Sequence, residues 1–238
     1  MKGGTVMKYD VILFDADGTL LDFARSEREA VCEALIKMGV TPDDEMIGEY
    51  SKINDSFWKM LERGEIAKNE LFHKRFEVLF SRYGIDADPI VMADTYMKTL
   101  SEKGYLLDGA YELCADLYGK VKMYIVTNGA EFIQRSRQKI SGILPLFDGV
   151  FISDVIGYEK PRIEFFEYVE KDIEDFSKER TLIVGDSLTS DIAGGIGYGI
   201  DTCWYDPDHK EPRIDMADKI TYIAYDYDDV RRVILQGE

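Results

Sequence analysis

The chain has 238 residues, enough for one large domain or two smaller ones with a substantial core. Acidic residues outnumber basic ones by 46 to 29, and the formal net charge of −17 makes binding to DNA or long RNA unfavourable. No apolar run approaches the roughly 18 residues needed to cross a bilayer, and residues 1–8 lack a signal-peptide pattern. We therefore expect a globular, cytoplasmic protein that binds neither a membrane nor a nucleic acid polymer.

The three cysteines, Cys32, Cys114 and Cys203, are widely spaced and match neither a disulfide framework nor a zinc-binding pattern. We interpret them as small buried side chains in a reducing compartment. The two histidines, His73 and His209, have no partner pattern that suggests a metal site or a catalytic triad. Neither residue type is assigned a chemical role.

The first predicted element is a short buried strand, Val11–Phe14, which is followed by carboxylates and a glycine. This apolar run is too short for a helix and fits a strand that is covered on both faces. The alternation of strand side chains places Asp15 and Asp17 on one side and turns Ala16 away. Gly18 then allows the backbone to turn out of the sheet.

Asp15 and Asp17 put two like charges at the end of this strand. At about 4 Å and an effective dielectric constant near 20, two carboxylates repel each other by about 4 kcal/mol, so a cation or a shared proton is needed. Mg²⁺ is suitable because it prefers hard oxygen ligands and leaves room for water and a substrate phosphate. The alternative is an ordinary strand end with turn-forming residues.

After Asp22 the pattern changes from strand to helix for some eighty residues. Apolar residues recur at helical spacing in four segments, residues 31–38, 46–61, 72–83 and 90–100. Glycines at or near the ends of the first three, Gly39, Gly64 and Gly84, suit helix C-termini. We predict a helical bundle that is inserted between the first strand and the rest of the sheet.

From about Gly104 onward, predicted helices and strands alternate, which is typical of a parallel sheet with helices on its faces. The predicted strands are residues 122–126, 149–153, 181–184, about 202–204, and 219–224. The predicted helices are residues 109–118, 130–140, 163–171, 191–198 and 230–235. No internal repeat or long linker interrupts this order.

Polar residues follow four of the predicted strands: Asp15 and Asp17, then Thr127 and Asn128, then Lys160, then Asp186. Alone, Thr127-Asn128-Gly129 would be a turn and Lys160 a solvated surface lysine. The carboxyl ends of parallel strands meet at one edge of a sheet, where α/β proteins bind ligands. The fold therefore predicts that these side chains form one site.

Each of these residues has a chemical task in such a site. The carboxylates of Asp15 and Asp186 and the backbone carbonyl of Asp17 would hold Mg²⁺. Thr127 and Asn128 offer neutral hydroxyl and amide donors to phosphate oxygens. Lys160 would bring a positive charge to the nucleophile and the phosphate. Asp191, five residues after Asp186, would support the site by orienting a metal-bound water.

These four motifs correspond, one for one and in order, to those of the haloacid dehalogenase superfamily, and the chain resembles its phosphatase branch. The resemblance implies that Asp15 is the nucleophile that becomes an aspartyl-phosphate and that Asp17 is the general acid and base. Dehalogenases of the superfamily have no aspartate at the second position. Asp17 therefore indicates phosphoryl transfer and not carbon–halogen cleavage.

The resemblance also implies an α/β fold, a Rossmann-like parallel sheet core with an inserted helical cap domain. We expect residues 1–22 and 104–238 to form the catalytic core and residues 23–103 to form the cap. Almost the whole chain is similar to house-cleaning pyrimidine 5′-nucleotidases, with further matches at Trp58, Gly64, Arg75, Phe76, Leu107–Ala110 and Asp201–Trp204. One departure is Gly18, where that branch usually has an acidic residue.

The inserted segment would carry the specificity. Its aromatic residues Phe57, Trp58 and Phe72 could stack on a base, and Arg75 could reach a phosphate or ribose. The alternative is that they are core residues, as aromatic residues in helical stripes usually are.

The sequence thus predicts a Mg²⁺-dependent phosphomonoesterase with an aspartyl-phosphate intermediate, acting on pyrimidine or noncanonical nucleoside 5′-monophosphates. A sugar-phosphate phosphatase or a phosphosugar mutase of the same fold would use the same aspartates and is the alternative. A non-catalytic binding module would be expected to lack at least one catalytic carboxylate, and none is missing here. The physiological substrate and the oligomeric state are left open.

Overall fold

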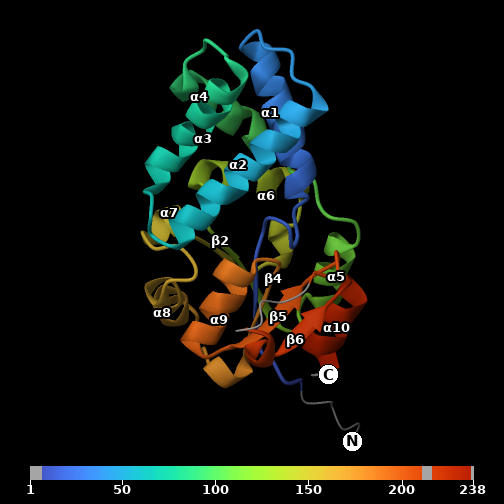
Figure 1. Ribbon diagram of the computed structural model, residues 1–238. Coiled ribbons are helices and arrows are strands. Elements are labelled where there is room, and N and C mark those ends of the chain that lie inside the picture. The colour runs from blue at the N-terminus through green and yellow to red at the C-terminus, as the bar shows by residue number, and fades with distance from the viewer. Residues whose placement is uncertain (1–6, 211–215, 237–238) are drawn as a thin grey trace, which may run out of the picture. The chain divides into compact units, whose positions relative to one another are not determined.

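The computed structural model describes residues 7–210 and 216–236 (Figure 1). Within this range the chain forms two units. The first, unit 1, contains the chain up to Leu21, residues 106–131, and the chain from Ser141 onward. The second, unit 2, contains Asp22–Tyr105 and the segment Phe132–Ile140.

Unit 1 is built on a parallel sheet with six strands in the described part of the chain. The strands are β1 (Val11–Phe14), β2 (Lys122–Thr127), β3 (Gly149–Ile152), β4 (Thr181–Gly185), β5 (Asp201–Tyr205) and β6 (Tyr222–Ala224). Their order is β3-β2-β1-β4-β5-β6, and every neighbouring pair is parallel. The predicted α/β class with a parallel sheet is therefore confirmed, and β1 lies between β2 and β4.

Helices cover both faces of this sheet. The side chains of β1 alternate between the two faces and therefore contribute to two hydrophobic cores. Ile12 and Phe14 pack with α5 (Ala110–Leu117) and α10 (Tyr227–Gln236). Val11 and Leu13 point to the opposite face and pack with α8 (Ile163–Asp172) and α9 (Ala193–Tyr198). Figure 1 shows the two helix pairs on either side of the strands. This two-sided burial explains why β1 is apolar throughout.

Several element boundaries differ from the prediction. The last strand begins at Tyr222 and not at residue 219, because Ala217–Lys219 forms a 3-10 turn, η4. Thr221 and Thr202 exchange hydrogen bonds between the hydroxyl of each and the backbone amide of the other, in place of a backbone ladder. The helix predicted over residues 191–198 begins at Ala193, because Leu188–Ile192 forms a π-helical turn, η3. A short helix, α7 (Ser153–Ile156), was not predicted. Two 3-10 turns complete the assignments, η1 (Leu144–Leu146) and η2 (Lys178–Arg180).

Unit 2 contains the four predicted helices, which the structure places at α1 (Phe23–Lys37), α2 (Asp44–Glu62), α3 (Lys68–Tyr83) and α4 (Pro89–Ser101). Local chemistry sets their ends. Asp43 and Asp88 accept hydrogen bonds from amides in the first turns of α2 and α4. Gly84 has φ +62° and ends α3 in the left-handed conformation.

Most of α6 (Glu131–Ser141) also belongs to unit 2, although the predicted cap covers residues 23–103 alone. The reason is a close backbone approach. Arg137 donates from Nε to the carbonyl of Lys103 at 3.0 Å, and a Cβ on Gly104 would lie 2.4 Å from the carbonyl oxygen of Arg137. The functional division into a catalytic core and a cap stays a prediction.

A charged residue, Arg75, lies in the interior of unit 2 with 3% of its surface exposed. Its guanidinium lies 4.8 to 5.9 Å from the ring centroids of Tyr50, Phe72, Phe76 and Tyr96. Its Nη1 donates to Asn54 Oδ1 at 2.5 Å.

Asn54 in turn connects this arginine to a buried acid. Its Nδ2 donates to Glu27 Oε1 at 2.6 Å, and Ser51 donates to the other carboxylate oxygen at 2.6 Å. Burial raises the pKa of Glu27, while these two hydrogen bonds and the charge of Arg75 lower it. Arg75 is therefore a structural residue of this core, as the alternative interpretation held.

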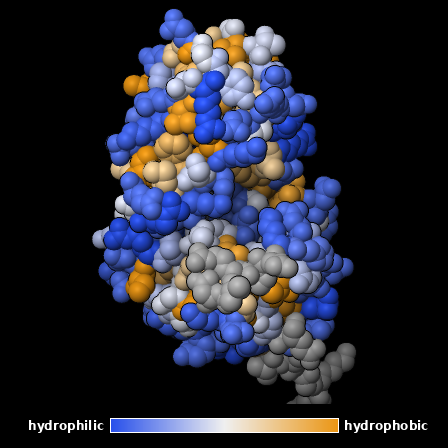
Figure 2. Space-filling view, in the orientation of Figure 1, coloured by the Kyte–Doolittle hydropathy of each residue, from blue (hydrophilic) through white to orange (hydrophobic). Residues whose placement is uncertain are grey.

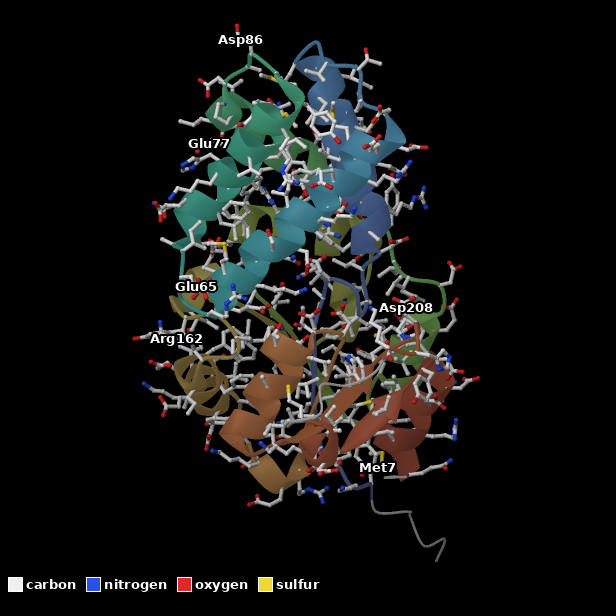
Figure 3. All side chains as sticks on the ribbon, in the orientation of Figure 1. Met7, Glu65, Glu77, Asp86, Arg162 and Asp208 are labelled. Carbon is white, nitrogen blue, oxygen red and sulfur yellow. The ribbon has the colours of Figure 1, made fainter. Side chains whose placement is uncertain are left out.

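The surface has the opposite composition. The face shown in Figure 2 is mostly hydrophilic, with scattered hydrophobic side chains. Glu77 and Arg162 lie at the outline of the molecule in Figure 3. Glu77, Arg162 and Asp208 each have about half or more of the side chain exposed. No helix in the described residues is both long enough and apolar enough to span a membrane.

The interior position of Arg75 gives a stability prediction. Arg75→Met should lower the free energy of unfolding by about 3 to 5 kcal/mol, because it leaves Glu27 and Asn54 without their buried cationic partner. The control is Arg28→Met, which removes an exposed ion pair with Asp44 and should cost less than about 1 kcal/mol. Urea denaturation of both variants measures the difference, and equal losses would contradict the structural role.

Candidate active site

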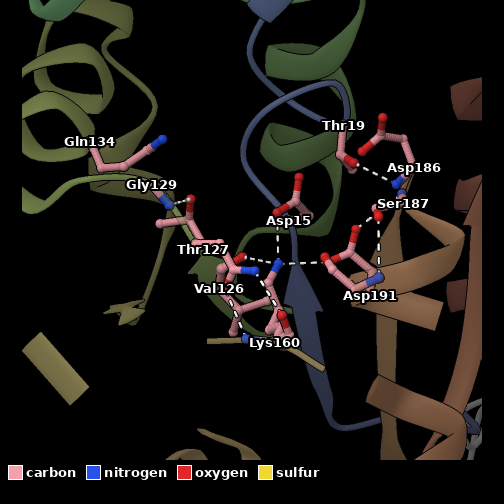
Figure 4. Close-up of polar contacts among 12 residues, drawn as sticks. Asp15, Thr19, Val126, Thr127, Gly129, Gln134, Lys160, Asp186, Ser187 and Asp191 are labelled. Carbon is pink, nitrogen blue, oxygen red and sulfur yellow. Dashed lines mark hydrogen bonds and ion pairs between the residues drawn. The ribbon is translucent and has the colours of Figure 1, made fainter. Parts of the chain in front are cut away.

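Lys160 is the centre of the candidate site (Figure 4). Its ammonium donates to Asp15 Oδ1 at 2.7 Å, to Asp191 Oδ1 at 2.5 Å and to the carbonyl of Val126 at 2.8 Å. The lysine is fully buried, which is unusual for this residue type without charged partners. The ammonium therefore has a hydrogen-bond acceptor for each of its three protons.

Asn128, just beyond β2, holds the backbone of Lys160. Its Oδ1 accepts from the amide of Lys160 and its Nδ2 donates to the carbonyl of Lys160, both at 2.8 Å. The side chain predicted to contact phosphate is thus engaged with the lysine in this structure. Thr127 is 2% exposed at the end of β2, and its hydroxyl accepts from the amide of Gly129 at 3.2 Å.

Asp15 lies one residue beyond β1, between the ends of β2 and β4, and its amide donates to the carbonyl of Val184 at 2.9 Å. The chain then turns sharply. The amide of Leu20 donates to the carbonyl of Ala16 at 2.9 Å, and that of Gly18 to the carbonyl of Leu21 at 3.0 Å. Asp17 lies on this turn and is half-buried.

Two glycines allow carboxylates to approach the backbone closely. Gly18 has φ +83°, and a Cβ there would lie 2.5 Å from Asp186 Oδ2. At Gly185, a Cβ would lie 2.3 Å from Asp191 Oδ2. The close approach of Asp186 and the positive φ explain why a glycine occupies position 18, where the branch that the chain resembles usually has an acidic residue.

Asp186 and Asp191 come from the segment after β4. The amide of Asp186 donates to the Thr19 hydroxyl at 3.0 Å, and its carbonyl accepts from Trp204 Nε1 at 3.0 Å. Asp191 Oδ2 accepts from the amide of Ser187 at 3.1 Å, and its other oxygen pairs with Lys160. The structure thus shows an ion pair for Asp191, and its predicted contact with a metal-bound water stays a prediction.

Burial and neighbouring charges shift the pKa values of the ionisable groups in this cluster. Burial and the charge of Asp191 raise the pKa of Asp15 well above its usual range, although Lys160 opposes them. The same two causes raise the pKa of Asp186 to about 7. Burial alone would lower the pKa of Lys160, but the charges of Asp15 and Asp191 outweigh it and raise that pKa.

These features fit a divalent cation. Asp15, Asp186 and Asp191 each offer a carboxylate oxygen, and these oxygens lie within 4.8 Å of one another. When all three carboxylates are ionised, they exceed the charge of the Lys160 ammonium by two negative charges. Hard oxygen ligands with this charge suit Mg²⁺.

The structure brings together Asp15, Lys160, Asp186 and Asp191 and ties Asn128 to the lysine. Sequence reasoning missed the contacts of Thr19, Ser187 and Trp204. The hydroxyl next to Gly18 and the serine directly after Asp186 were visible as polar residues beside motifs. Nothing in the sequence signalled that Trp204 would reach Asp186, because that contact depends on strand order.

The predicted specificity residues lie in unit 2. Arg75 is in its interior, as described above. Trp58, Phe57 and Phe72 are half-buried and pack on an apolar cluster of Leu61, Ile66 and Leu71. These three aromatic side chains keep partly exposed surface.

The chain is similar to several known proteins. A sequence model of haloacid dehalogenase-like hydrolases matches residues 9–199. The chain is 40% identical over 225 residues to the pyrimidine 5′-nucleotidase PynA of Streptococcus pneumoniae, covering 94% of each protein. It is 32% identical over 205 residues to the pyrimidine 5′-nucleotidase YjjG of Escherichia coli, covering 86% of this chain and 89% of YjjG.

A solved structure agrees with these matches. The crystal structure of the HAD-hydrolase YfnB of Bacillus subtilis bound to magnesium superimposes with a TM-score of 0.91 at 36% identity, covering 95% of this chain and 99% of YfnB. The predicted resemblance to the nucleotidase branch is therefore confirmed.

The raised pKa of Asp186 gives a pH prediction for the metal-free protein. Between about pH 4 and about pH 7 the folded state binds a proton at Asp186 that the unfolded state does not, so this stabilisation is complete below about pH 4 and is lost as the pH rises through about 7. In a chelator, the melting temperature of the wild type should therefore fall more steeply over this window than that of Asp186→Asn. Asp44→Asn, at an exposed aspartate that pairs with Arg28 in unit 2, is the control. Thermal melts over the pH series measure this, and parallel curves for wild type and Asp186→Asn would contradict it.

Proposed function

The chain belongs to the haloacid dehalogenase-like hydrolases, and on that premise we propose that it is a Mg²⁺-dependent phosphomonoesterase acting on nucleoside 5′-monophosphates, pyrimidine ones first. The observation that carries the proposal is the buried contact of Lys160 with Asp15 and Asp191, beside the carboxylate of Asp186. It supports a nucleophile that is paired with a cation next to a site for a metal and a phosphate.

In the proposed mechanism, Asp15 attacks phosphorus with a carboxylate oxygen. The phosphorus–oxygen bond to the leaving alcohol breaks, and Asp17 gives that oxygen a proton. Asp17 then takes a proton from water, which attacks the aspartyl-phosphate and releases phosphate and the free carboxylate of Asp15. A carboxylate attacks in its ionised form, and the positive charge of Lys160 opposes the effect of burial on Asp15.

The remaining residues bind and orient. Asp15 and Asp186 would hold Mg²⁺ through carboxylates, and Asp17 through its backbone carbonyl. The bound metal would stabilise negative charge on the phosphoryl oxygens. Thr127 would donate its hydroxyl proton to a phosphate oxygen, and Asn128 would keep Lys160 in place through its two hydrogen bonds.

The substrate proposal is supported by the two relatives named as pyrimidine 5′-nucleotidases. A small phosphate ester is also compatible with a net charge of −17, because bound Mg²⁺ and Lys160 can reverse the field within one site. The proposal places the enzyme in the cytoplasm, where the free thiols of Cys32, Cys114 and Cys203 would stay reduced.

The activity is tested with a panel of nucleoside monophosphates, hexose phosphates and a generic aryl phosphate, by measuring phosphate release with Mg²⁺ and with excess chelator. We expect the highest kcat/KM for pyrimidine nucleotides and no turnover in chelator. Asp15→Asn should lower kcat by on the order of a thousandfold or more, because it removes the nucleophile.

Asp10→Asn is the matched control, since Asp10 is an exposed aspartate that pairs with Arg180 at the other end of β1. Normal turnover by a folded Asp15→Asn enzyme would disprove the mechanism. Faster hydrolysis of hexose phosphates than of every nucleotide would disprove the substrate class alone.

A second variant tests the contribution of unit 2 to specificity. If a base stacks on Trp58, Trp58→Ala should weaken kcat/KM for a pyrimidine nucleotide by about 1 to 3 kcal/mol and leave the generic phosphate almost unchanged. Tyr83→Ala, at a half-buried aromatic residue at the other end of α3 from Phe72, should change neither. Equal losses on both substrates would assign Trp58 to the core.

A further inference from the structure

The backbone of Asp186 is held by two side chains from other parts of unit 1. The ladder between β4 and β5 ends at the pair Gly185 and Trp204, so Asp186 is the first residue beyond it. Buried backbone groups outside a ladder need other partners. Here the Thr19 hydroxyl accepts from the amide, and Trp204 Nε1 donates to the carbonyl, each at 3.0 Å.

Both side chains are themselves fixed. Trp204 is 2% exposed and Thr19 is 1% exposed. The hydroxyl of Tyr227, on α10, donates to the carbonyl of Thr19 at 2.7 Å. The ring of Tyr227 stacks on Tyr205, with centroids 5.0 Å apart and an interplanar angle of 3°. The two contacts to Asp186 are therefore anchored in the C-terminal part of the unit.

The carboxylate of Asp186 is confined as well. It packs so closely on Gly18 that a Cβ there would lie 2.5 Å from Oδ2. With the amide, the carbonyl and the carboxylate each in contact with a different residue, the side chain has little freedom to turn. Figure 4 shows its carboxylate beside Thr19.

A fixed carboxylate matters because Mg²⁺ demands near-ideal geometry and loses affinity when a ligand is displaced. Partners that orient metal ligands typically change metal affinity 10- to 100-fold when they are removed.

We propose that Trp204 is a positioning residue that sets the Mg²⁺ affinity of the site by holding the backbone of Asp186, with Thr19 and Tyr227 as the second support. This inference rests on the proposed function, because it requires Asp186 to be a metal ligand.

A simpler role for Trp204 is to fill the core and satisfy its own buried N–H. The two roles differ in what they change. Loss of packing alone lowers the melting temperature equally with and without Mg²⁺. Loss of a positioned ligand also lowers the increase in melting temperature that Mg²⁺ produces.

The experiment is calorimetric titration of metal-free protein with Mg²⁺, together with thermal melts in chelator and in Mg²⁺. Trp204→Phe keeps an aromatic ring and removes the indole N–H, and it should raise the Mg²⁺ dissociation constant on the order of tenfold and reduce the Mg²⁺-induced stabilisation. Trp58→Phe, the same change at the other tryptophan of the chain, should leave both quantities at the wild-type value.

Tyr227→Phe is a milder second variant, because it removes one hydroxyl. It should also raise the Mg²⁺ dissociation constant, by less than Trp204→Phe does. Tyr198→Phe is its control, since Tyr198 bonds to Glu170 and stacks on Phe166. If Trp204→Phe does not fold, the comparison of these two tyrosine variants decides.

The possible failures can be told apart. If the wild type shows no saturable Mg²⁺ binding, the proposed function fails and the inference falls with it. If the wild type binds Mg²⁺ and the folded Trp204→Phe variant binds it equally well, the positioning role is overturned while the proposed function stands. Unchanged binding by Tyr227→Phe, where it is the deciding variant, would overturn the role in the same way.

Discussion

The buried contact of Lys160 with Asp15 and Asp191 is the interaction on which the rest of the site depends. Removing these charges from water costs several kcal/mol for each ion, and only close pairing offsets that cost. The ammonium at 2.5 and 2.7 Å from the two carboxylates provides such a pairing, and Asn128 keeps it in place by binding the lysine backbone on both sides. A displaced lysine would leave Asp15 both buried and uncompensated.

The pairing is incomplete, because Lys160 faces more than one carboxylate, and the proposed function depends on this excess of negative charge. One ammonium does not balance three carboxylates, and this imbalance adds to burial, which is the main cause of the raised pKa values of Asp15 and Asp186. Under the proposed function, the negative charge that Lys160 leaves uncompensated would be balanced by a divalent cation, which would in turn bind a phosphate. Gly18 and Gly185 increase the crowding, because they allow Asp186 and Asp191 to lie against the backbone. Buried carboxylates of this kind are expected to lower stability, as is common where function requires such a site.

In unit 2, the buried carboxylate of Glu27 has a different environment. Glu27 receives hydrogen bonds from Ser51 and Asn54, and Asn54 also accepts from Arg75, so charge and hydrogen bonding are met within the unit. Such a network holds a core together without any ligand. The contrast separates two kinds of buried charge in one chain. The Glu27 network is satisfied by protein partners and has a structural role. The carboxylates around Lys160 lack full charge compensation, which suits them to bind a cation.

The sequence by itself determined the parallel sheet, the order of its elements and the grouping of Asp15, Lys160 and Asp186. Periodicity and glycine positions are local signals, and parallel strands bring their carboxyl ends to one edge whatever the details of packing. The boundaries of the elements were predicted less accurately. They depend on specific contacts, such as the reciprocal hydrogen bonds between Thr202 and Thr221 and the capping of η3 by Ser187, which the hydrophobic pattern does not reveal.

Tertiary structure alone decided where individual side chains point. Asn128 faces Lys160, which is 32 residues away, Arg75 faces an aromatic interior, and Trp204 reaches the carbonyl of Asp186. Each of these contacts depends on the register and spacing of elements that are distant in sequence. The type of a side chain limits which kinds of group it can bind, but it does not decide which residue becomes its partner. For that reason the residue types of the site could be predicted from the sequence, whereas the contacts that hold them could not.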